Sequence, residues 1–454
     1  MMGLREAAAA MAGRLHGEDR PFYGAATDTR SMAAGELFFA IKGDRFDAVQ
    51  FLDQAFAAGA AGAVVQGEAL RAAAAPRSLI RVDDTRAALG RLATYWRRRF
   101  RLPLIAITGS NGKTTVKDMI AAVLRAGCAD PAEVLATEGN LNNDIGMPLT
   151  LLRLRASHRY AVIEMGMNHA GEIRYLSGLA RPNVALVTNA GSAHIGLLGS
   201  LDAIAQAKGE IYEGLDEGGI AIVNADDAFA DLWRSQNAHR RTIDFALDAQ
   251  AQVTGRYAGH ALHSDIVIRT PRGQCELRLD VPGEHNVRNA IAAAAAAYAL
   301  DVPLAAVGAG LAAFRGPKGR LQRCAGRNGA VVIDDSYNAN PESTLAAIAV
   351  LASMPGKRML VLGDMGELGA DTDASHLRAG EAARAAAIER LFTLGAASAL
   401  AAAAFGPSAR HFSRIEELVA AVEPELDADT TVLVKGSRFM GMERAVQSFK
   451  AEAP

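Results

Sequence analysis

Residues Thr108 to Thr115 carry glycine, lysine and threonine at the spacing of a phosphate-binding loop. Glycines let backbone amides close around phosphate oxygens, and a helix that follows adds partial positive charge at its N-terminus. Lys113 is placed to reach the β- and γ-phosphates of a nucleotide, and the Thr114 hydroxyl is placed to ligate Mg²⁺. The loop is the shorter GxxGKT form, because Ile107 stands where the longer consensus has a glycine. The alternative is a strand-to-helix turn that carries these residues by chance.

Glu164 ends the apolar run Ala161 to Ile163, which is typical of a buried strand. A carboxylate at the carboxyl end of a parallel strand points into the crevice where α/β proteins bind ligands. Its oxygens suit Mg²⁺ beside phosphates. By itself Glu164 could equally be a solvated strand end, but the phosphate loop upstream favours the metal role.

Four other residues are ambiguous by pattern. His194 follows a predicted strand and Lys208 lies on a predicted helix, where a lone histidine is usually structural and a lone lysine usually faces solvent. Asp335 follows the apolar run Val331 to Ile333 within a polar segment, which fits either a ligand loop or an ordinary turn. Arg320 could bring positive charge to a phosphate from another domain, or it could lie in a solvated linker.

The elements that would position these residues have the pattern of an α/β fold. From Pro103 on, short apolar strands alternate with helices, which predicts a parallel sheet covered on both faces. Residues 251–282 alternate like antiparallel strands instead. We expect three domains: a small N-terminal α/β domain (1–83), a central P-loop ATPase-like parallel-sheet domain (84–315, with 84–102 as a helical connector) and a C-terminal Rossmann-like α/β domain (316–454). No GxGxxG motif follows the first strand of the last domain, so no bound dinucleotide is expected there.

The composition indicates a folded protein without a global basic excess. Hydrophobic residues make up 50% of the 454 residues, enough apolar surface to offset the entropy of ordering the chain. Lys and Arg number 48 against 50 Asp and Glu, a net charge of −2, which argues against a nucleic-acid partner. We interpret the one dense basic segment, Arg97 to Arg101, as the solvated end of a helix.

Cysteine usage and hydropathy predict a cytoplasmic protein without a membrane span. The three cysteines lie far apart and form no CxxC motif, which argues against a zinc site and a disulfide framework. The longest apolar stretch, Ile291 to Leu300, is about half of the ~20 residues that a membrane span needs. Charge precedes any apolar run at the N-terminus, so a signal peptide is not expected.

Taken together, the motifs resemble those of the Mur ligases, the ATP-dependent amide-bond enzymes of peptidoglycan precursor synthesis. The resemblance covers nearly the whole chain, and its motifs stand in the family's order. It rests on Thr108 to Thr115, Glu164-Met165-Gly166, Thr188-Asn189 with His194, Ala207-Lys208, Gly283 to Asn286 with Asn289, Gly319-Arg320 and the Asp335 loop.

The resemblance implies one role for each domain. The first domain would hold the UDP end of the nucleotide substrate, the second would bind ATP and metal, and the third would close over the site and bring in the amino substrate. The implied catalytic residues are Lys113, Lys208, His194 and Arg320. The implied ATP-binding residues are Gly109, Ser110, Asn111, Gly112, Lys113, Thr114, Thr115, Asn286, Asn289, Arg320, Asp335, Tyr337 and Asn338. The implied Mg²⁺ ligands are Thr114, Glu164, His194 and Lys208, the last as a carbamate. The implied substrate-binding residues are Thr29, Arg30, Ser31, Asn140, Asn142 and Asn143.

Within the family, four segments are similar to the branch that adds a dipeptide: Asp28 to Ala40, Gly139 to Pro148, Asp334 to Pro341 and Leu362 to Gly369. The implied reaction joins D-alanyl-D-alanine to UDP-N-acetylmuramoyl-tripeptide through an acyl phosphate, with ATP and Mg²⁺, on a monomer. A ligase similar to folylpolyglutamate synthetase and a non-catalytic nucleotide-binding module stay open as alternatives. The third residue of the tripeptide, diaminopimelate or lysine, stays open too.

Overall fold

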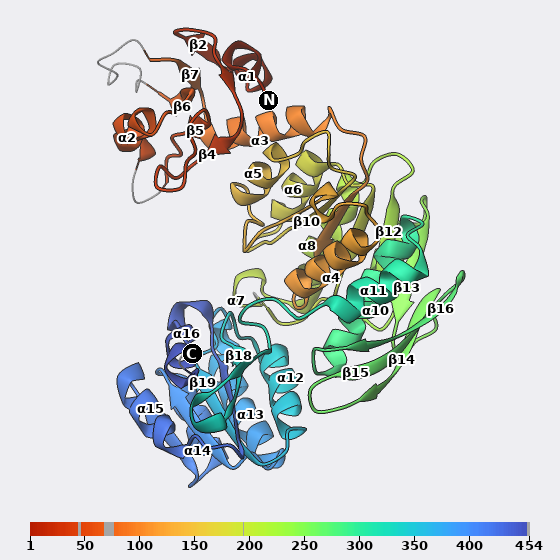
Figure 1. The fold of residues 1–454 in the computed structure, drawn as a ribbon, viewed down its shortest axis with the longest axis vertical. Helices are drawn as coiled ribbons and strands as arrows, with labels where there is room; N and C mark the ends of the chain where they lie inside the picture. Colours follow the sequence, from red (N-terminus) through yellow and green to blue (C-terminus); the bar gives the residue numbers. More distant parts are fainter. Residues whose placement is uncertain (44–46, 68–76, 194, 452–454) are drawn as a thin grey trace.

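The computed structural model describes residues 1–43, 47–67, 77–193 and 195–451. Within these residues the chain forms three α/β bodies, each built around its own sheet (Figure 1). The red N-terminal body and the blue C-terminal body lie at opposite ends of this view, and each contacts the central body. This arrangement agrees with the α/β fold class expected from the sequence.

The N-terminal body has a five-stranded sheet of order β2-β7-β6-β5-β4, in which only β2 is antiparallel to its neighbour. A two-stranded ribbon, β1 with β3, lies beside it. The bounds of its elements are β1 (Met2–Gly3), α1 (Leu4–Ala10), β2 (Arg14–His16), β3 (Pro21–Phe22), β4 (Ala25–Ala26), β5 (Leu37–Phe39), α2 (Leu52–Ala57), β6 (Gly62–Gln66) and β7 (Leu79–Val82).

Helix α3 (Thr85–Arg97) connects this body to the central one. The Asp84 carboxylate caps it by accepting from the amides of Arg86 and Ala87. The expectation of a solvated basic end is wrong for Arg97, whose side chain is buried. Its guanidinium donates to the carbonyls of Ala180 and Phe100, so Arg97 satisfies loop carbonyls rather than solvent.

The central sheet has nine strands of order β16-β15-β14-β13-β12-β11-β8-β10-β9. The strands from β9 to β14 pair in parallel, and β15 and β16 extend the sheet as antiparallel hairpins, as the alternation of residues 251–282 predicts. Its strands are β8 (Leu104–Thr108), β9 (Val134–Ala136), β10 (Tyr160–Glu164), β11 (Val184–Val187), β12 (Ile220–Asn224), β13 (Thr242–Ala246), β14 (Val253–Gly259), β15 (Ser264–Thr270) and β16 (Gly273–Leu279).

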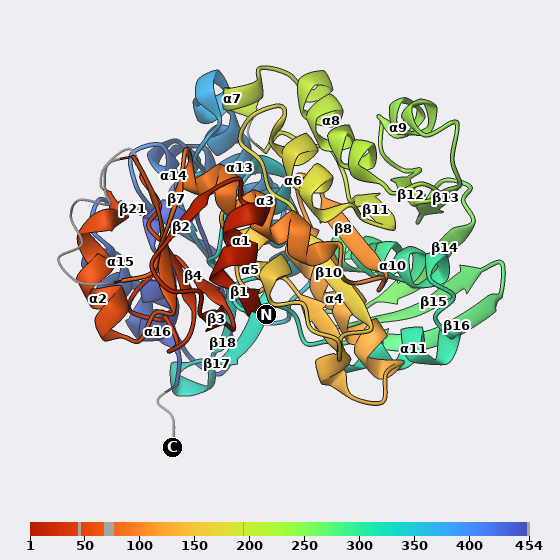
Figure 2. The same cartoon turned by 90° about the horizontal axis from the view of Figure 1, so that it is seen from above.

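Helices cover both faces of this sheet, because successive strand residues point to opposite sides. On β8, Leu104 and Ala106 join the apolar cluster under one helix layer, whereas Ile105 and Ile107 join the cluster under the other. The first layer contains α3, α5 (Gly146–Leu152), α6 (Glu172–Ala180), α8 (Leu201–Gly209) and α9 (Ala230–Gln236), and the second contains α4 (Lys113–Ala126), α10 (Glu284–Ala299) and α11 (Leu304–Ala313). Figure 2 shows β14, β15 and β16 at the edge of the sheet away from the N-terminal body.

The C-terminal body has a six-stranded sheet of order β17-β18-β22-β19-β20-β21, parallel except for the edge strand β17. Separate apolar clusters fill its two faces, as in a doubly wound sheet. Its elements are β17 (Gln322–Ala325), β18 (Val331–Asp335), α12 (Pro341–Ala352), β19 (Lys357–Gly363), α13 (Thr372–Ala385), β20 (Arg390–Leu394), α14 (Ser398–Phe405), β21 (Ala409–Phe412), α15 (Ile415–Val422), β22 (Thr430–Lys435) and α16 (Glu443–Phe449).

Among the described residues, no helix is both long enough and apolar enough to cross a membrane. A short helix, α7 (Ile195–Leu198), follows the strand β11 and leads to α8.

Candidate active site

The phosphate-binding loop joins β8 to α4, and its two glycines occupy positions that strongly favour glycine. Gly109 has a φ of +151°, and a Cβ there would lie 1.8 Å from the Thr188 hydroxyl oxygen. Gly112 has a φ of +82°, and a Cβ there would lie 2.5 Å from the Asn289 amide oxygen. No side chain caps the N-terminus of α4, so the first amides of this helix are available to an anion.

A second segment, Thr188 to Gly191, holds the loop in shape. The Asn189 amide oxygen accepts from the Asn111 backbone N–H at 2.9 Å, and the Thr188 hydroxyl donates to the Asn111 carbonyl at 2.6 Å. The Ser110 hydroxyl donates to the Gly191 carbonyl at 3.0 Å and accepts from the Gly191 N–H at 2.9 Å. Ser110 and Asn111, expected at the nucleotide, therefore shape the loop with their side chains and backbone.

Lys113 is the first residue of α4, and its ammonium folds back over the loop. It donates to the carbonyls of Gly109 at 2.6 Å and Ser110 at 3.2 Å. Burial lowers the pKa of Lys113 from 10.5 to about 8, with the Glu164 carboxylate opposing this effect and Arg320 adding to it. The lysine is thus a partly desolvated cation between a carboxylate and a guanidinium, next to the amides that would cradle phosphate.

Glu164 ends β10 and is buried. One carboxylate oxygen accepts from the Asn142 amide at 2.8 Å, whereas the other, Oε2, is buried with no hydrogen-bond partner among the described residues. The Thr108 hydroxyl lies at the end of the neighbouring strand β8. It too is buried and has no hydrogen-bond partner among the described residues. Unpartnered buried oxygens of this kind suit a hard divalent cation, so the residues present fit Mg²⁺.

Lys208 lies near the end of α8 and is only 1% exposed, which overturns the pattern-based expectation of a solvated helical lysine. Its side-chain nitrogen makes no hydrogen bond or ion pair with the described residues, whereas its backbone carbonyl accepts from the Glu210 N–H. Burial first, and then the nearby Lys113 ammonium, hold the pKa of Lys208 well below its usual range. A lowered pKa favours the neutral amine, which is the form that could add CO₂. His194, expected near this point, lies outside the described residues.

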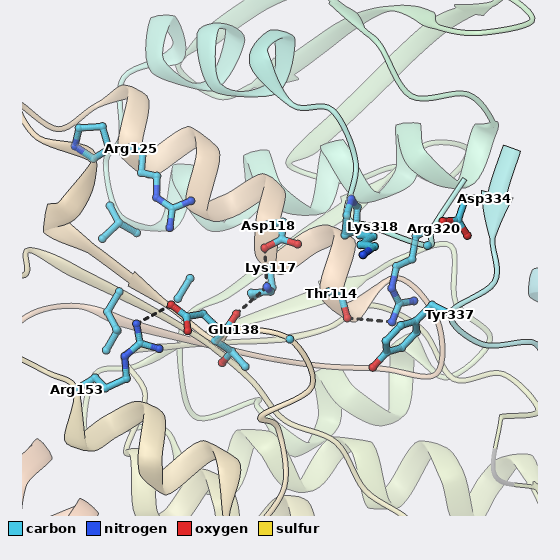
Figure 3. A pocket seen from close by; sticks show the side chains of 18 of the residues that line it. Thr114, Lys117, Asp118, Arg125, Glu138, Arg153, Lys318, Arg320, Asp334 and Tyr337 are labelled. Atoms are coloured by element: carbon cyan, nitrogen blue, oxygen red, sulfur yellow. Dashed lines mark hydrogen bonds and ion pairs between the residues drawn. The ribbon is translucent and has the colours of Figure 1, made fainter. Parts of the chain in front are cut away.

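The C-terminal body brings Arg320 to the loop. Its guanidinium donates to the Thr114 hydroxyl at 3.1 Å and lies over the Tyr337 ring at 4.4 Å. Figure 3 shows Arg320 and Tyr337 together beside Thr114. Arg320 is therefore not a solvated linker residue but a cation from another body placed at the start of α4.

Asp335, at the end of β18, is buried and pairs with Lys435, which ends the neighbouring strand β22. The Lys435 ammonium donates to the Asp335 carboxylate at 2.6 Å and to the Asn338 carbonyl at 3.0 Å. Burial raises the pKa of Asp335, although Lys435 opposes this shift. Lys435 is not evident from local sequence patterns; its one signal is a lysine directly after the apolar run Val432 to Val434.

We expect replacement of Lys435 by methionine to destabilise the C-terminal body by about 3–5 kcal/mol, because Asp335 would remain as an unpaired buried charge. Hydrogen exchange of the β18 and β22 amides measures this loss as a lower opening free energy. The control is Lys357→Met, which breaks a half-buried pair with Glu425 and should change stability by about 1 kcal/mol or less. Equal effects of the two variants would contradict the assignment.

The N-terminal turn of α10 faces the same region. The Asn286 amide donates to the Pro282 carbonyl at 2.7 Å, and the Asn289 amide donates to the Asn286 amide oxygen at 3.2 Å. His285, which sequence reasoning did not single out, has its pKa lowered to about 4 by burial and then by Lys435. Asn289 thus lies against Gly112 of the loop, and His285 lies near the Asp335–Lys435 pair.

Two more contacts, missed from the sequence, join the C-terminal body to the loop. The Asn340 amide donates to the Asn111 side-chain oxygen at 2.8 Å, across 229 residues of chain. The Glu342 carboxylate accepts from the Ser192 amide and hydroxyl, both at 2.9 Å. Asn340 also caps α12, so the start of this helix is fixed against the phosphate loop.

A cleft of about 920 Å³ lies between α4, residues 131–139 and the C-terminal body. Thr114, Arg320 and Tyr337 line one part of it, and Lys117, Glu138 and Arg153 line another (Figure 3). Lys117 is buried and donates to the Thr137 carbonyl at 2.8 Å. The cleft therefore extends from the phosphate loop to a wall that carries both positive and negative side chains. It is large enough to hold a second substrate.

The structure places the expected substrate residues in two separate regions. Thr29, Arg30 and Ser31 lie on the N-terminal body, where Arg30 pairs with Asp28 at 2.6 Å, and none of them lines the cleft. Of the other set, Asn142 touches Glu164, and Asn140 is exposed. The Asn143 side-chain oxygen accepts from two backbone amides at the start of α5, so this oxygen is committed to the fold.

Models of three Mur ligase domains match the chain: the Mur ligase middle domain at residues 107–297, the glutamate ligase domain at 319–438 and the Mur ligase family catalytic domain at 21–97. A relative from Escherichia coli (strain K12), named UDP-N-acetylmuramoyl-tripeptide–D-alanyl-D-alanine ligase, is 42% identical over 442 residues, which cover 96% of each chain.

Solved structures agree with these matches. MurF from Acinetobacter baumannii has a TM-score of 0.89 and 35% identity, covering 98% of both chains. The MurF ligase from Thermotoga maritima, solved in complex with ADP, has a TM-score of 0.81 over 94% of this chain and 96% of that chain. At 24% identity, the second likeness bears on the fold alone.

Proposed function

The chain belongs to the Mur ligase family, and from this premise we propose that it joins D-alanyl-D-alanine to UDP-N-acetylmuramoyl-tripeptide at the expense of ATP, in peptidoglycan precursor synthesis. The observation that carries this function is 42% identity over 96% of the chain to an Escherichia coli ligase named for that reaction. The loop geometry supports it, since Lys113, Thr114 and Arg320 meet at one point.

The ATP phosphates would lie on the loop from Gly109 to Thr115, with Lys113 and Arg320 on either side. Asn286, Asn289, Asp335, Tyr337 and Asn338 lie where α10 and the C-terminal body face the loop, which supports the proposal that they contact the adenosine end. Lys435 and His285 belong to the same region through Asp335. Asn340 and Glu342 hold the C-terminal body against the loop and its supporting segment.

Magnesium would be held by Thr114 and Glu164, with His194 and a carbamate on Lys208 as further groups. When bound, it would offset the repulsion between the substrate carboxylate and the phosphates. The unpartnered Glu164 oxygen and the buried Lys208, whose pKa is held well below its usual range, support this proposal. The role of His194 as a metal ligand is inferred from the family resemblance alone.

The reaction needs activation, because a carboxylate is a poor electrophile. The tripeptide carboxylate attacks the γ-phosphorus of ATP, which gives an acyl phosphate and releases ADP. The free amine of D-alanyl-D-alanine then attacks the acyl carbon, and phosphate leaves. Lys113 and Arg320 would neutralise charge on the transferring phosphoryl group, so this chain's contribution is mainly positioning and electrostatics.

The acceptor nucleotide would reach this point from the N-terminal body. Thr29, Arg30 and Ser31 are exposed or half-buried there, which supports contact with its UDP end. The Asn140 to Asn143 segment directly follows Glu138 and Gly139, which line the cleft, and its Asn142 contacts Glu164. This segment would therefore face the peptide end of the acceptor nucleotide. The division at residues 83 and 315, a monomeric state and a cytoplasmic location stay proposals.

We expect the amino substrate to be a dipeptide rather than a single amino acid. With ATP and UDP-N-acetylmuramoyl-tripeptide, phosphate release should be much faster with D-alanyl-D-alanine than with D-alanine or diaminopimelate. Mass spectrometry should show a product heavier than the tripeptide substrate by the dipeptide minus water. Faster turnover with diaminopimelate would exclude the dipeptide branch but not the family, and no phosphate release with any amine would favour a non-catalytic nucleotide-binding module.

A further inference from the structure

The turn between β14 and β15 carries three potential metal ligands on one face. His260 and His263 flank the two tip residues, and the His260 N–H donates to the His263 carbonyl at 2.9 Å, which makes the two histidines a cross-strand pair. Asp265 pairs with Ala258 and stands two residues beyond His263. Because side chains alternate along a strand and opposite residues share a face, all three side chains project to the same side.

The ligand atoms of these side chains are already close together. His260 Nε2 lies 3.2 Å from Asp265 Oδ2, and the two imidazole rings stack with centroids 4.4 Å apart. All three ligand atoms lie within 4.8 Å of one another. Zinc bonds of about 2.0–2.2 Å put neighbouring ligand atoms about 3.3 Å apart in a tetrahedron. One pair has this spacing, and a rotation of the half-buried His263 ring brings in the third.

No other contact competes for these groups in the part of the chain that the structure describes. The His263 ring has no hydrogen-bond partner there, and the only side chain that hydrogen-bonds to the His260 ring there is Asp265. Arg278 stands opposite Asp265 on β16, but its guanidinium bonds to Asp280 at 2.8 Å instead. Two imidazoles and one carboxylate form a donor set that suits zinc better than Mg²⁺.

The site is separate from the candidate active site but lies at a junction of two bodies. None of its three ligands lines the cleft described above. The tip residues between the histidines, Ala261 and Leu262, pack against the apolar cluster of the C-terminal body. A metal bound here would cross-link β14 and β15 next to that contact.

We propose that His260, His263 and Asp265 bind one zinc ion, with water completing the coordination. This site goes beyond the ligase reaction and does not depend on it. It also revises the expectation against zinc, which rested on cysteine spacing and overlooked the His-x-x-His-x-Asp pattern of residues 260–265. The half-exposed position of these side chains leaves room for water and gives zinc direct access from solvent.

The test is zinc titration of the metal-stripped full-length enzyme in excess Mg²⁺, followed by calorimetry. The wild type should bind one zinc ion that His260→Ala and His263→Ala lose or bind at least ten-fold more weakly. Co²⁺ in place of zinc should give the wild type a visible absorption band, because a metal ion bound by few ligands in low symmetry absorbs visible light. These variants should lack the band. The matched control is His169→Ala, which removes an exposed histidine that also pairs with a carboxylate, Glu172, and should bind zinc like the wild type.

Two results would overturn the proposal: no zinc bound by the wild type, or zinc bound equally by the wild type and all histidine variants. Melting temperatures without metal should be similar for all proteins, because His260 and Asp265 are exposed and the half-buried His263 ring has no hydrogen-bond partner among the described residues. Asp265→Asn provides a second variant that keeps the side-chain shape, and it should weaken zinc binding as well. Unchanged zinc affinity in this variant would remove the carboxylate from the site.

Discussion

Replacement of Lys113 by alanine is expected to reduce ligation by about 10²–10³-fold or more, the usual effect of removing one preorganised charge at a transition state. The Lys113 ammonium lies over the phosphate loop, between Glu164 and Arg320, where it would meet the β- and γ-phosphates. Its folded-state contacts are two carbonyls of the same loop, so the fold should survive. Phosphate release with all three substrates measures the effect, and circular dichroism should be unchanged.

The pH dependence gives this prediction a second readout. Because the pKa of Lys113 is about 8, its positive charge is present below pH 8 and is lost as the pH rises through that value. The KM for ATP should therefore rise above pH 8 in the wild type, and this rise should be absent from Lys113→Ala. Lys357→Ala, at the first residue of β19 in the C-terminal sheet, is the control for loss of a lysine. Near wild-type activity of Lys113→Ala would mean that the loop does not bind ATP as proposed.

Replacement of Lys208 by alanine is expected to remove most activity, about a hundred-fold or more, and a small carboxylate such as acetate or formate should restore part of it. The physical reason is burial without a counter-charge: Lys208 is 1% exposed, and its pKa is held well below normal. A neutral amine can add CO₂ and become an anion, whereas an ammonium beside a metal would be repelled. Activity of the wild type should also fall in buffer stripped of CO₂.

The controls separate a carbamate from a packing role. Lys208→Met keeps most of the buried volume without an amine, so it should fold and be inactive. Lys208→Arg restores a positive charge without oxygen ligands and should not replace the lysine. Full activity of Lys208→Arg would contradict the carbamate, and loss of activity without any rescue by acetate would favour a structural role.

Local patterns in the sequence predicted the elements of the site well. The GxxGKT loop, the strand ends at Glu164 and Asp335, and the antiparallel strands within residues 251–282 all occur as expected, because each depends on neighbouring residues. Short strands such as β9 were not recognised, since three residues give too little periodicity.

Long-range contacts could not be predicted in the same way. Asn340 reaches Asn111 across 229 residues, and the Lys435–Asp335 pair spans 100 residues. The burial of Lys208 and Arg97 has the same origin, because a helical lysine or arginine looks alike in sequence whether another layer covers it or not. The family resemblance supplied Lys208 and Arg320, and physical patterning alone would have left both at the surface.

The contact made by the β14–β15 tip affects how this chain could be divided. Leu262 lies in the turn between two strands of the central sheet, yet it packs against the apolar cluster of the C-terminal body. Cleavage of the chain at the Gly316 to Gly319 turn would therefore expose two complementary apolar surfaces. One fragment would expose the Leu262 side chain, and the other would expose the apolar patch that this leucine covers. The two fragments would be poor candidates for separate expression and good candidates for reassembly by complementation, since the tip that would be exposed on one fits the patch left on its counterpart.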